Sequence, residues 1–446
     1  MALSNGNGKT NPEAESPEKS TDYYFQYYAS LQNQANMIQD FSRTQAYRRA
    51  ILGNAVPAFQ DKVVIDIGAG SGILSYFAAK SPIRHQAGAK KVLAIEASGM
   101  ASKIEVLLRH AERTGSNPHL NGRVEVINGK VEDEKVQARA LAYGKVDTII
   151  SEPIGVMLYH ERMVESYLLA RDLFLKPGGS LYPSAGSLYF APFSDEALFL
   201  ETEAKASFFN QTLFGTDFTP LSELSKQEAF EQPIVGLINP ATLVASEICP
   251  QTFDFYTLTN EELQDFTLDL DWYMPKTCLV HGIASWFDLN FAPPRGTKPS
   301  ADPVNDNLHR QWDEAASPTG IWAYDTSMNP AELPPPPSDG LSVTLDTGPY
   351  ANRTHWQQCR LLLSEPLAVN RGQRVVGSIR FRTNTNRSYD LDLEIRVVAE
   401  GEQPDQHVEL PNTKRTGRFD LGKQTYNYSY NPDAAVGAMS GLMNGM

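Results

Sequence analysis

The segment K-V-V-I-D-I-G-A-G-S-G, residues 62–72, joins a short apolar run to three alternate glycines. The run has the length and composition of a strand buried in a parallel sheet. Glycines after such a strand permit a tight turn and close approach of a ligand to the backbone. The dinucleotide fingerprint requires a further glycine where this chain has Ile73. A nicotinamide-dependent dehydrogenase is therefore only a remote alternative.

Three more apolar runs of this kind follow, with helical patterns between them, over residues 91–96, 123–129 and 145–152. This alternation predicts an α/β fold with a doubly wound, mostly parallel sheet. Glu96 ends the second run, where an acid can accept hydrogen bonds from ribose hydroxyls. Asp66, inside the first run, is expected to brace the glycine turn rather than to carry chemistry.

Helical patterns flank this region. One extends from Tyr23 to Leu52, and another covers roughly residues 160–175 before the stop signal L-K-P-G-G. After Tyr182-Pro183 the pattern changes to strand-like alternation with many turns. This change predicts a first domain over 22–183 and a second, barrel-like β domain.

The second domain is expected to span residues 184–420. Within it, 205–232 is less strand-like and is predicted to project as an arm, and 292–340 is a proline-rich insertion. The polar segment 1–21 is predicted to be disordered, and 421–446 a flexible tail.

Composition excludes several classes of protein. The 446 residues carry a formal net charge of −14, which argues against a nucleic-acid binder with a basic face and suits a cationic partner. Ordinary solubility charge remains the simpler interpretation. No run of about 18 apolar residues indicates a membrane span, and the N-terminus has no signal-peptide pattern. Three scattered cysteines fit a reducing compartment and argue against a zinc cluster.

Two glutamates, Glu152 and Glu161, bracket an apolar loop in S-E-P-I-G-V-M-L-Y-H-E-R-M, residues 151–163. Such a pair can be an acid/base pair, a metal site, a clamp for a cation, or ordinary surface charge. Glu152 follows the fourth run, at the sheet edge where ligands bind. Glu161 could instead favour a helix N-terminus through the helix dipole.

The combination of motifs resembles the protein arginine methyltransferases. S-E-P in place of S-E-W, with L-V-H-G-I-A-S-W-F-D (279–288) and R-S-Y-D-L (387–391), points to their coactivator-associated branch. The resemblance covers roughly residues 22–291 and 341–400. Its motifs, in family order, are Y-F-Q-Y-Y (24–28), N-M-I-Q-D-x-x-R-T (36–44), D-I-G-A-G-S-G-I-L-S (66–75), A-I-E-A-S (94–98), G-K-V-E-D (129–133), the two-glutamate loop (151–163) and T-H-W (354–356).

The resemblance implies an S-adenosylmethionine-binding Rossmann-like domain, a C-terminal β-barrel-like domain and a homodimer joined through the arm. It assigns Glu152 and Glu161 to the substrate guanidinium, which is effectively always protonated and suits two carboxylates. It assigns proton handling to Asp40 and His355, a carboxylate that orients an imidazole. Trp356 would line the slot for the substrate arginine.

The resemblance also implies a cofactor site, with no metal. Tyr24, Phe25 and Tyr28 would form an aromatic lid, and Arg43 would bind the cofactor carboxylate. Met37 would wall the arginine slot, and Glu132 would accept from the adenine amino group beside Met163 and Ser166. The remaining cofactor-binding candidates are Gln34, Asp66, Gly68, Gly70, Gly72, Glu96, Ala97, Ser98, Lys130, Val131 and Glu152.

Three positions depart from the family pattern. Ile154 stands where methionine is usual, Val156 where tyrosine is usual, and His160 where asparagine is usual. The first two flank the clamp and bear on which dimethyl isomer forms. Because Met37 is retained, asymmetric dimethylation, the type I product, is expected.

The expected substrates are arginines of histones or of transcription or RNA-processing proteins, with no direct binding of nucleic acid or membrane. Nuclear and cytoplasmic localisation is implied by resemblance alone. Two alternatives stay open: a methyltransferase of a small molecule, and an inactive S-adenosylmethionine-binding scaffold.

Overall fold

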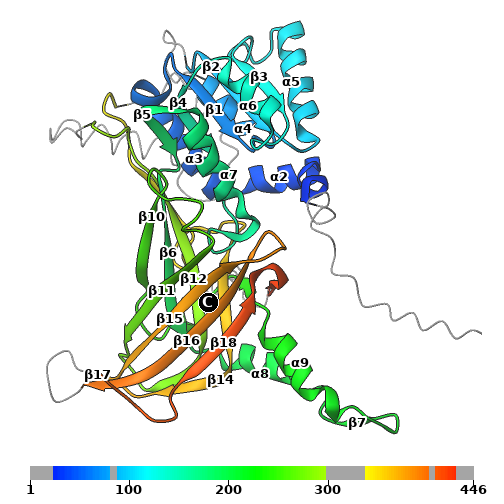
Figure 1. Cartoon of the computed structure of the whole chain (residues 1–446), viewed down its shortest axis with the longest axis vertical. Coiled ribbons are helices and arrows are strands. Elements are labelled where there is room, and N and C mark those ends of the chain that lie inside the picture. The colour runs from blue at the N-terminus through cyan, green and yellow to red at the C-terminus, as the bar shows by residue number, and fades with distance from the viewer. Residues whose placement is uncertain (1–23, 81–87, 298–336, 401–406, 428–446) are drawn as a thin grey trace, which may run out of the picture.

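The computed structural model describes residues 24–80, 88–297, 337–400 and 407–427. The segment 1–21, most of the insertion 292–340 and the tail beyond residue 427 lie outside the described residues. Figure 1 shows an α/β body at one end of the molecule, an elongated β body at the other, and a helical arm projecting from the β body.

The α/β body is built on a five-stranded parallel sheet in the order β3-β2-β1-β4-β5. All four strands that the apolar runs predict are present, and the doubly wound prediction is confirmed. The strands are β1 (Val63–Ile67), β2 (Lys91–Glu96), β3 (Val124–Asn128), β4 (Val146–Ser151) and β5 (Leu175–Tyr182). The helices beside them are α3 (Phe41–Gly53), α4 (Ile73–Ala79), α5 (Met100–Thr114), α6 (Glu134–Leu141) and α7 (Met163–Phe174).

The helical region before β1 is divided. Residues 24–28 are helical, α2 spans Leu31–Gln39, and α3 follows with only Asp40 between them. The Ser30 side chain accepts from the Gln32 N–H, and the Asp40 side chain accepts from the Arg43 N–H. These are N-caps, so the pattern from Tyr23 to Leu52 represents successive helices rather than one. A π-helical turn, Ala55–Phe59, leads into β1.

The helix predicted over 160–175 begins later. His160–Arg162 forms a 3-10 turn in which Glu161 and Arg162 have positive φ, so α7 starts at Met163. The L-K-P-G-G stop signal ends α7 correctly, but these residues also begin β5. Sequence reasoning missed this strand because its first half is largely exposed and carries Pro and Gly.

The β body contains two mainly antiparallel sheets, which confirms a separate C-terminal β domain. One sheet has the order β10-β6-β12-β14-β9-β19, with β13 on β12. The other has the order β11-β15-β16-β17, with β18 on β16. The longer strands are β6 (Ala185–Phe193), β10 (Ile248–Asp254), β11 (Asp265–Tyr273), β12 (Cys278–Phe291), β14 (Gln358–Val369), β15 (Arg374–Thr383) and β16 (Tyr389–Glu400). The shorter ones are β9 (Ile234–Gly236), β13 (Val343–Asp346), β17 (His407–Glu409), β18 (Arg415–Asp420) and β19 (Thr425–Tyr426).

The projecting arm consists of two helices joined by a small hairpin (Figure 1). Its elements are α8 (Glu196–Ala206), β7 (Thr212–Leu213), β8 (Thr216–Asp217), a 3-10 turn (Thr219–Leu221) and α9 (Ser222–Phe230). The helical part therefore starts before residue 205, where the predicted arm begins. The Asp195 side chain fixes this start, because it caps α8 by accepting from the Leu198 N–H.

The flexible tail predicted from residue 421 is wrong for residues 421–427. Leu421 is fully buried in a 3-10 turn, Leu421–Lys423, and β19 runs parallel to β9. The Thr425 N–H donates to the Pro233 carbonyl and the Asn427 N–H to the Val235 carbonyl. Backbone pairing with β9 orders this segment despite its polar composition.

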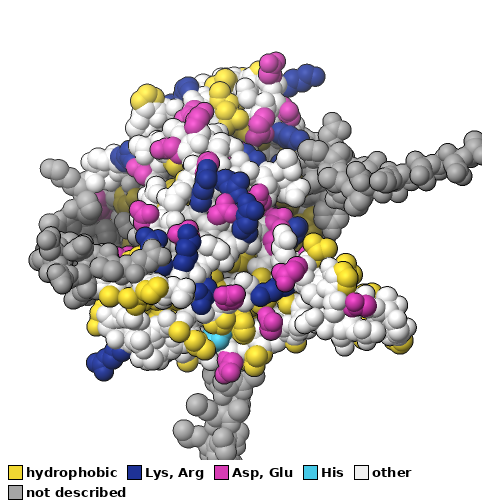
Figure 2. Space-filling model, turned by 60° about the horizontal axis from the view of Figure 1, so that its bottom comes forward, with side chains coloured by type: hydrophobic (Ala, Val, Ile, Leu, Met, Phe, Trp, Pro, Cys, Tyr) yellow, Lys and Arg dark blue, Asp and Glu magenta, His cyan; other side chains and the backbone are white. Residues whose placement is uncertain are grey.

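Opposite charges alternate on the outer face of the second sheet. Arg380 pairs with Asp265, and both Arg382 and Arg418 pair with Asp392. Figure 2 shows basic and acidic side chains interspersed over the face that it displays. In the described part of the chain, no group of three or more metal-ligand side chains occurs, and no helix is long and apolar enough to cross a membrane.

Candidate active site

A cavity of about 1110 Å³ lies at the carboxyl ends of β1, β2 and β4, between the N-terminal helices and the β body. Most of the site residues predicted from the sequence line it. These are Tyr24, Phe25, Tyr28, Gln34, Met37, Arg43, Gly68, Gly70, Glu96, Ala97, Lys130, Val131, Glu132, Glu152, Glu161, Met163, Ser166, His355 and Trp356.

Four predicted residues do not border the cavity: Asp40, Asp66, Gly72 and Ser98. Asp66 is fully buried, and its Oδ2 accepts from the Ser75 hydroxyl at 2.7 Å. Burial raises its pKa to about 7. Asp66 therefore braces the first turn of α4, next to the glycine turn that it is expected to brace, and it does not border the cavity. Gly72 is the N-cap of α4 and has positive φ.

The glycine turn and Glu96 form one unit. Gly68 and Gly70 have φ of +68° and +54°, which side chains rarely adopt. The Gly70 N–H donates to Glu96 Oε2 at 2.7 Å, and the Ser98 N–H donates to Oε1 at 2.6 Å. Two backbone donors thus orient the carboxylate at the cavity wall. An anionic Glu96 on the Gly70 N–H opposes a diphosphate at this turn and suits a neutral ribose.

The loop between the two glutamates folds tightly on itself. The Gly155 N–H donates to the Leu158 carbonyl at 3.2 Å, and Met157 and Leu158 have positive φ. A Cβ at Gly155 would overlap the His160 carbonyl oxygen, so glycine is required here. The loop is also fixed from the β body, because Trp356 Nε1 donates to the Ile154 carbonyl at 3.0 Å.

Glu152 is paired with Arg43. The Arg43 Nη2 and Nε atoms lie 2.5 and 3.1 Å from Glu152 Oε2, and both side chains are buried. Arg43 Nη1 also donates to the Met37 carbonyl at 3.2 Å. Burial alone would lower the pKa of Arg43, but the charge of Glu152 outweighs it and raises that pKa. Arg43 therefore fixes the Glu152 carboxylate at the wall of the cavity, which both residues line.

Glu161 lines the same cavity as Glu152. Its two carboxylate oxygens each lie 2.9 Å from the Tyr28 hydroxyl, which donates to them. Burial is the main reason that the pKa of Glu161 rises to about 7, and the charge of Glu152 adds to the rise. A carboxylate whose ionisation is opposed by burial and by a neighbouring negative charge favours a cationic ligand beside it.

Asp40 and His355 are hydrogen-bonded despite their separation in sequence. Asp40 Oδ2 lies 2.7 Å from His355 Nδ1 and accepts from the His355 backbone N–H at 2.7 Å. Burial would raise the pKa of Asp40, but the bonds from His355 and from the Arg43 N–H outweigh it and lower that pKa. Asp40 thus orients the imidazole through Nδ1 without bordering the cavity itself, while His355 lines the cavity beside Trp356.

The cavity is also lined by a second polar pair and by the helical segment 24–28, which is called the aromatic helix below. The Ser166 hydroxyl donates to Glu132 Oε1 at 2.5 Å. Lys130 Nζ lies 5.1 Å from the centre of the Phe25 ring. Gln34 Nε2 donates to the Tyr28 carbonyl at 3.1 Å, which ties helix α2 to the aromatic segment.

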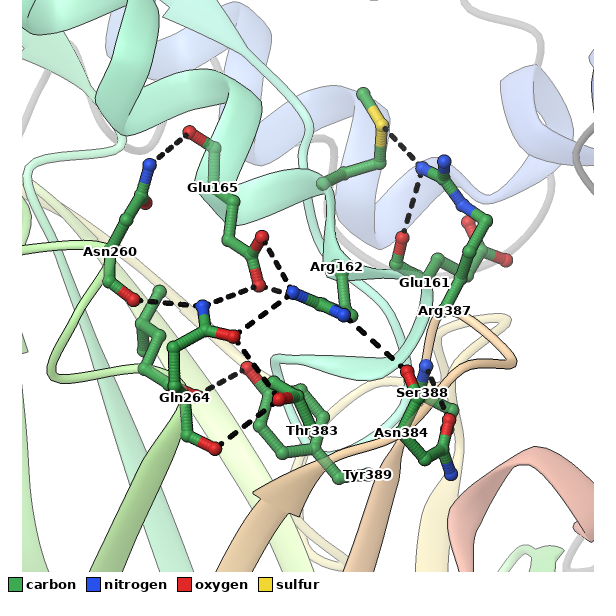
Figure 3. Close-up of polar contacts among 12 residues, drawn as sticks. Glu161, Arg162, Glu165, Asn260, Gln264, Thr383, Asn384, Arg387, Ser388 and Tyr389 are labelled. Atoms are coloured by element: carbon green, nitrogen blue, oxygen red, sulfur yellow. Dashed lines mark hydrogen bonds and ion pairs between the residues drawn. The ribbon is translucent and has the colours of Figure 1, made fainter. Parts of the chain in front are cut away.

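Sequence reasoning missed the β-body residues that hold the two-glutamate loop. Figure 3 shows Arg162 and Glu165 of the α/β body among side chains of the β body, including those of the turn between β15 and β16. Arg162 donates to Glu165 and to Gln264 Oε1, and His160 Nδ1 lies 2.9 Å from the Ser388 hydroxyl. Burial lowers the pKa of His160 to about 4, so it is neutral near pH 7. Ser388 belongs to the motif R-S-Y-D-L (387–391), but only the fold shows that it contacts the two-glutamate loop.

The chain is similar to known arginine methyltransferases. Residues 184–312 and 322–402 match the family model "Arginine methyltransferase oligomerization subdomain". The histone-arginine methyltransferases CARMER of Drosophila erecta and Drosophila mojavensis are each 38% identical over 381 residues, 85% of this chain. The match covers 59% and 58% of those relatives, so the chain spans about three-fifths of their length.

Two solved structures resemble the whole described fold. The Trypanosoma brucei PRMT1 enzyme–prozyme heterotetrameric complex with AdoHcy has a TM-score of 0.61 and 27% identity, covering 88% of this chain and 99% of that chain. Arabidopsis thaliana protein arginine methyltransferase 10 has a TM-score of 0.65 and 24% identity, covering 89% and 100%, and supports the fold alone. The chain belongs to the protein arginine methyltransferase family.

Proposed function

We propose that the protein transfers methyl groups from S-adenosylmethionine to guanidino nitrogens of arginines in protein substrates. The observation that carries this proposal is the pair Glu152 and Glu161, one buried and one half-buried carboxylate that line the same cavity as the glycine turn. The relatives named above are histone-arginine methyltransferases, and one structural neighbour holds AdoHcy.

The residues at the sheet edge fit the proposed methyl donor. Glu96 presents a fixed carboxylate for ribose hydroxyls, Glu132 and Ser166 offer polar atoms for a purine, and Arg43 offers a cation for a carboxylate. Close approach to the backbone is possible because Gly68 and Gly70 carry no side chain. When bound, S-adenosylmethionine supplies a methyl group activated on a sulfonium.

The two glutamates bind and polarise the substrate. A guanidinium has five N–H donors in a planar fork, and Glu152 and Glu161 accept them from two sides. Their charges draw positive charge toward the bound nitrogens and leave electron density on the reacting one. In this structure Tyr28 donates to Glu161 and Arg43 to Glu152, so substrate binding exchanges these internal donors for the guanidinium.

A proton must leave the guanidinium as the new bond forms. With Nδ1 of His355 on Asp40, Nε2 is the nitrogen available to accept that proton. Asp40 keeps the ring oriented and stabilises the imidazolium. Much of the rate enhancement then comes from positioning and from the electrostatics of the clamp.

The walls around the clamp decide the product. Ile154 and Val156 are nearly buried and line the cavity with Met37. We propose that the enzyme is type I and forms monomethylarginine and asymmetric dimethylarginine. Fragmentation of the dimethylated product distinguishes this isomer from the symmetric one.

We also propose that the protein is a homodimer joined through the arm α8–α9 and acts on histones or other proteins of the nucleus, with cytoplasmic substrates as well. The family model for residues 184–312 and 322–402 is an oligomerization subdomain, which supports association. The arm exposes large apolar side chains, including Phe208, Phe214 and Leu224, that a second chain would cover. Sedimentation equilibrium of the full chain tests the dimer.

The activity is tested with S-adenosylmethionine, core histones and an arginine-rich peptide, analysed by mass spectrometry. The expected result is a mass increment of one or two methyl groups on arginine. Binding of S-adenosylmethionine with no transfer to histones or peptide would favour the scaffold alternative. Transfer only to small guanidino compounds would favour the small-molecule alternative.

A further inference from the structure

The two-glutamate loop is held by one turn of the β body, residues 384–388 between β15 and β16. Three consecutive loop residues are contacted by this turn. Ser388 Oγ lies 2.9 Å from His160 Nδ1, and the Asn384 carbonyl accepts from Arg162 Nη1 at 3.4 Å. Between them, Arg387 Nη2 donates to the Glu161 carbonyl oxygen at 3.2 Å (Figure 3).

The backbone that this turn contacts is strained. Glu161 and Arg162 have φ of +74° and +56°, a region that non-glycine residues rarely occupy. Such conformations are strained and persist only where the surroundings impose them. At Glu161 these surroundings include the hydrogen bond that its carbonyl accepts from Arg387, and the contacts of His160 and Arg162 with the same turn.

Arg387 makes more contacts than the single hydrogen bond. Its guanidinium carbon lies 4.7 Å from the centre of the Tyr24 ring, and Nη2 lies 3.9 Å from Met163 Sδ. Arg387 therefore touches three parts of the site: the aromatic helix, the Glu161 backbone and the first residue of α7. A cation over the face of an aromatic ring is attracted to it, which fixes the Tyr24 ring relative to Glu161.

We propose that Arg387 is a positioning residue for Glu161: from the β15–β16 turn it fixes the strained backbone of the clamp and the aromatic helix against it. The β body would then help to build the catalytic site as well as joining subunits. This inference rests on the proposed function, because Glu161 is the group through which Arg387 acts.

The electrostatics support the geometry. The positive charge of Arg387 opposes the rise in the pKa of Glu161 that burial causes. Removing this charge should raise that pKa further, so that Glu161 ionises only at higher pH. The titratable and charged groups that face Glu161 are Tyr24 and Tyr28 from the first helix, Glu152 from the end of β4, and Arg387. Among them Arg387 is the cation.

The test compares Arg387→Gln, Arg387→Lys and Arg418→Gln in the full chain. Arg418 is a matched control, since its side chain is 82% exposed and pairs with Asp392 on the outer sheet face. We expect Arg387→Gln to lower kcat/KM for an arginine peptide about 10- to 100-fold, the range for a misplaced catalytic group. The acidic limb of the pH profile of kcat/KM should move to higher pH in this variant. This profile reports the pKa values of groups in the free enzyme, and that of Glu161 is expected to rise.

Arg387→Lys keeps the charge without the planar fork, so it should restore the position of the acidic limb and only part of the rate. Arg418→Gln should match the wild type. An acidic limb that does not move in Arg387→Gln overturns the proposal whatever the loss of rate, because a merely structural defect lowers the rate at every pH alike.

A second readout needs no activity, and it separates this inference from the proposed function. Thermal unfolding is followed at pH 5 and pH 8 in four proteins. They are the wild type, Arg387→Gln, Glu161→Gln, and the double variant that carries both substitutions. Arg387→Gln should lose more stability at pH 8 than at pH 5, and Glu161→Gln should abolish this extra loss. If the extra loss persists without Glu161, Arg387 does not act through it. If the variants show the expected unfolding pattern but the wild type methylates no arginine, only the proposed function is contradicted.

Discussion

Replacing Glu161 by glutamine should make the protein more stable above neutral pH and nearly inactive. The glutamine side chain keeps the size of the glutamate and one acceptor oxygen for the Tyr28 hydroxyl, so the loop need not move. What is lost is the negative charge in a buried site. The same charge that would bind the substrate therefore costs folding free energy.

The size of the stability effect follows from the pKa of Glu161, which burial raises from an ordinary 4.5 to about 7. Between these values the folded state binds more protons than the unfolded state, so stability falls as pH rises through this window. The difference corresponds to at most roughly 3 kcal/mol, fully expressed above pH 7. Glutamine does not titrate, so the variant avoids this loss.

The effect on catalysis has the opposite sign. Loss of one transition-state charge contact costs roughly 3 kcal/mol or more, which is at least about a hundredfold in turnover. Affinity for S-adenosylmethionine should change little, because the proposed function assigns Glu161 to the substrate guanidinium and not to the cofactor.

The assay combines urea unfolding at pH 5 and pH 8 with peptide methylation and calorimetric binding of the cofactor. We expect near-equal stability at pH 5, a more stable variant at pH 8, and turnover reduced at least a hundredfold. Near-normal turnover would refute the clamp. If Glu161→Gln differs from the wild type in stability by the same amount at pH 5 and at pH 8, Glu161 is not a carboxylate whose ionisation costs folding free energy.

Three further outcomes follow from the site. Glu96→Ala should weaken binding of S-adenosylmethionine roughly 10- to 100-fold in calorimetry, because a charged acceptor contributes about 1.5–3 kcal/mol; unchanged affinity would remove Glu96 from the cofactor site. Asp40→Asn should lower kcat about 100-fold or more by releasing the His355 ring, with cofactor affinity retained; a wild-type kcat would exclude the dyad. Gly155→Ala should reduce stability by about 1–3 kcal/mol in urea unfolding, because its Cβ overlaps the His160 carbonyl oxygen; unaltered stability would show that the loop can relax.

Much of the α/β body could be predicted because its signals are local. The apolar runs of β1 to β4 are largely buried, and the glycine turn sits next to the strand that it follows. Strand β5 was missed because its first half carries Lys176, Pro177 and two glycines. The composition of residues 421–427 predicts a flexible tail, because their order comes from pairing with distant β9 and leaves no local signal.

The site divides in the same way. Sequence motifs identified Glu152, Glu161 and the pair Asp40–His355, and the fold brings all four together. The sequence could not show that Arg43 pairs with Glu152, or that the Tyr28 hydroxyl lies on Glu161, since both depend on side-chain geometry. Arg387 opens the motif R-S-Y-D-L (387–391), but the sequence could not show that it contacts Glu161, because that contact joins two domains.

The central claim is that Glu152 and Glu161 clamp a guanidinium for methylation. The most direct measurement is fragmentation mass spectrometry of a peptide with one arginine and one lysine, after incubation with S-adenosylmethionine and the full chain. We predict methyl groups on the guanidino nitrogens alone, absent with Glu152→Gln or Glu161→Gln. Methyl groups on lysine, or equal methylation by either variant, would contradict the clamp.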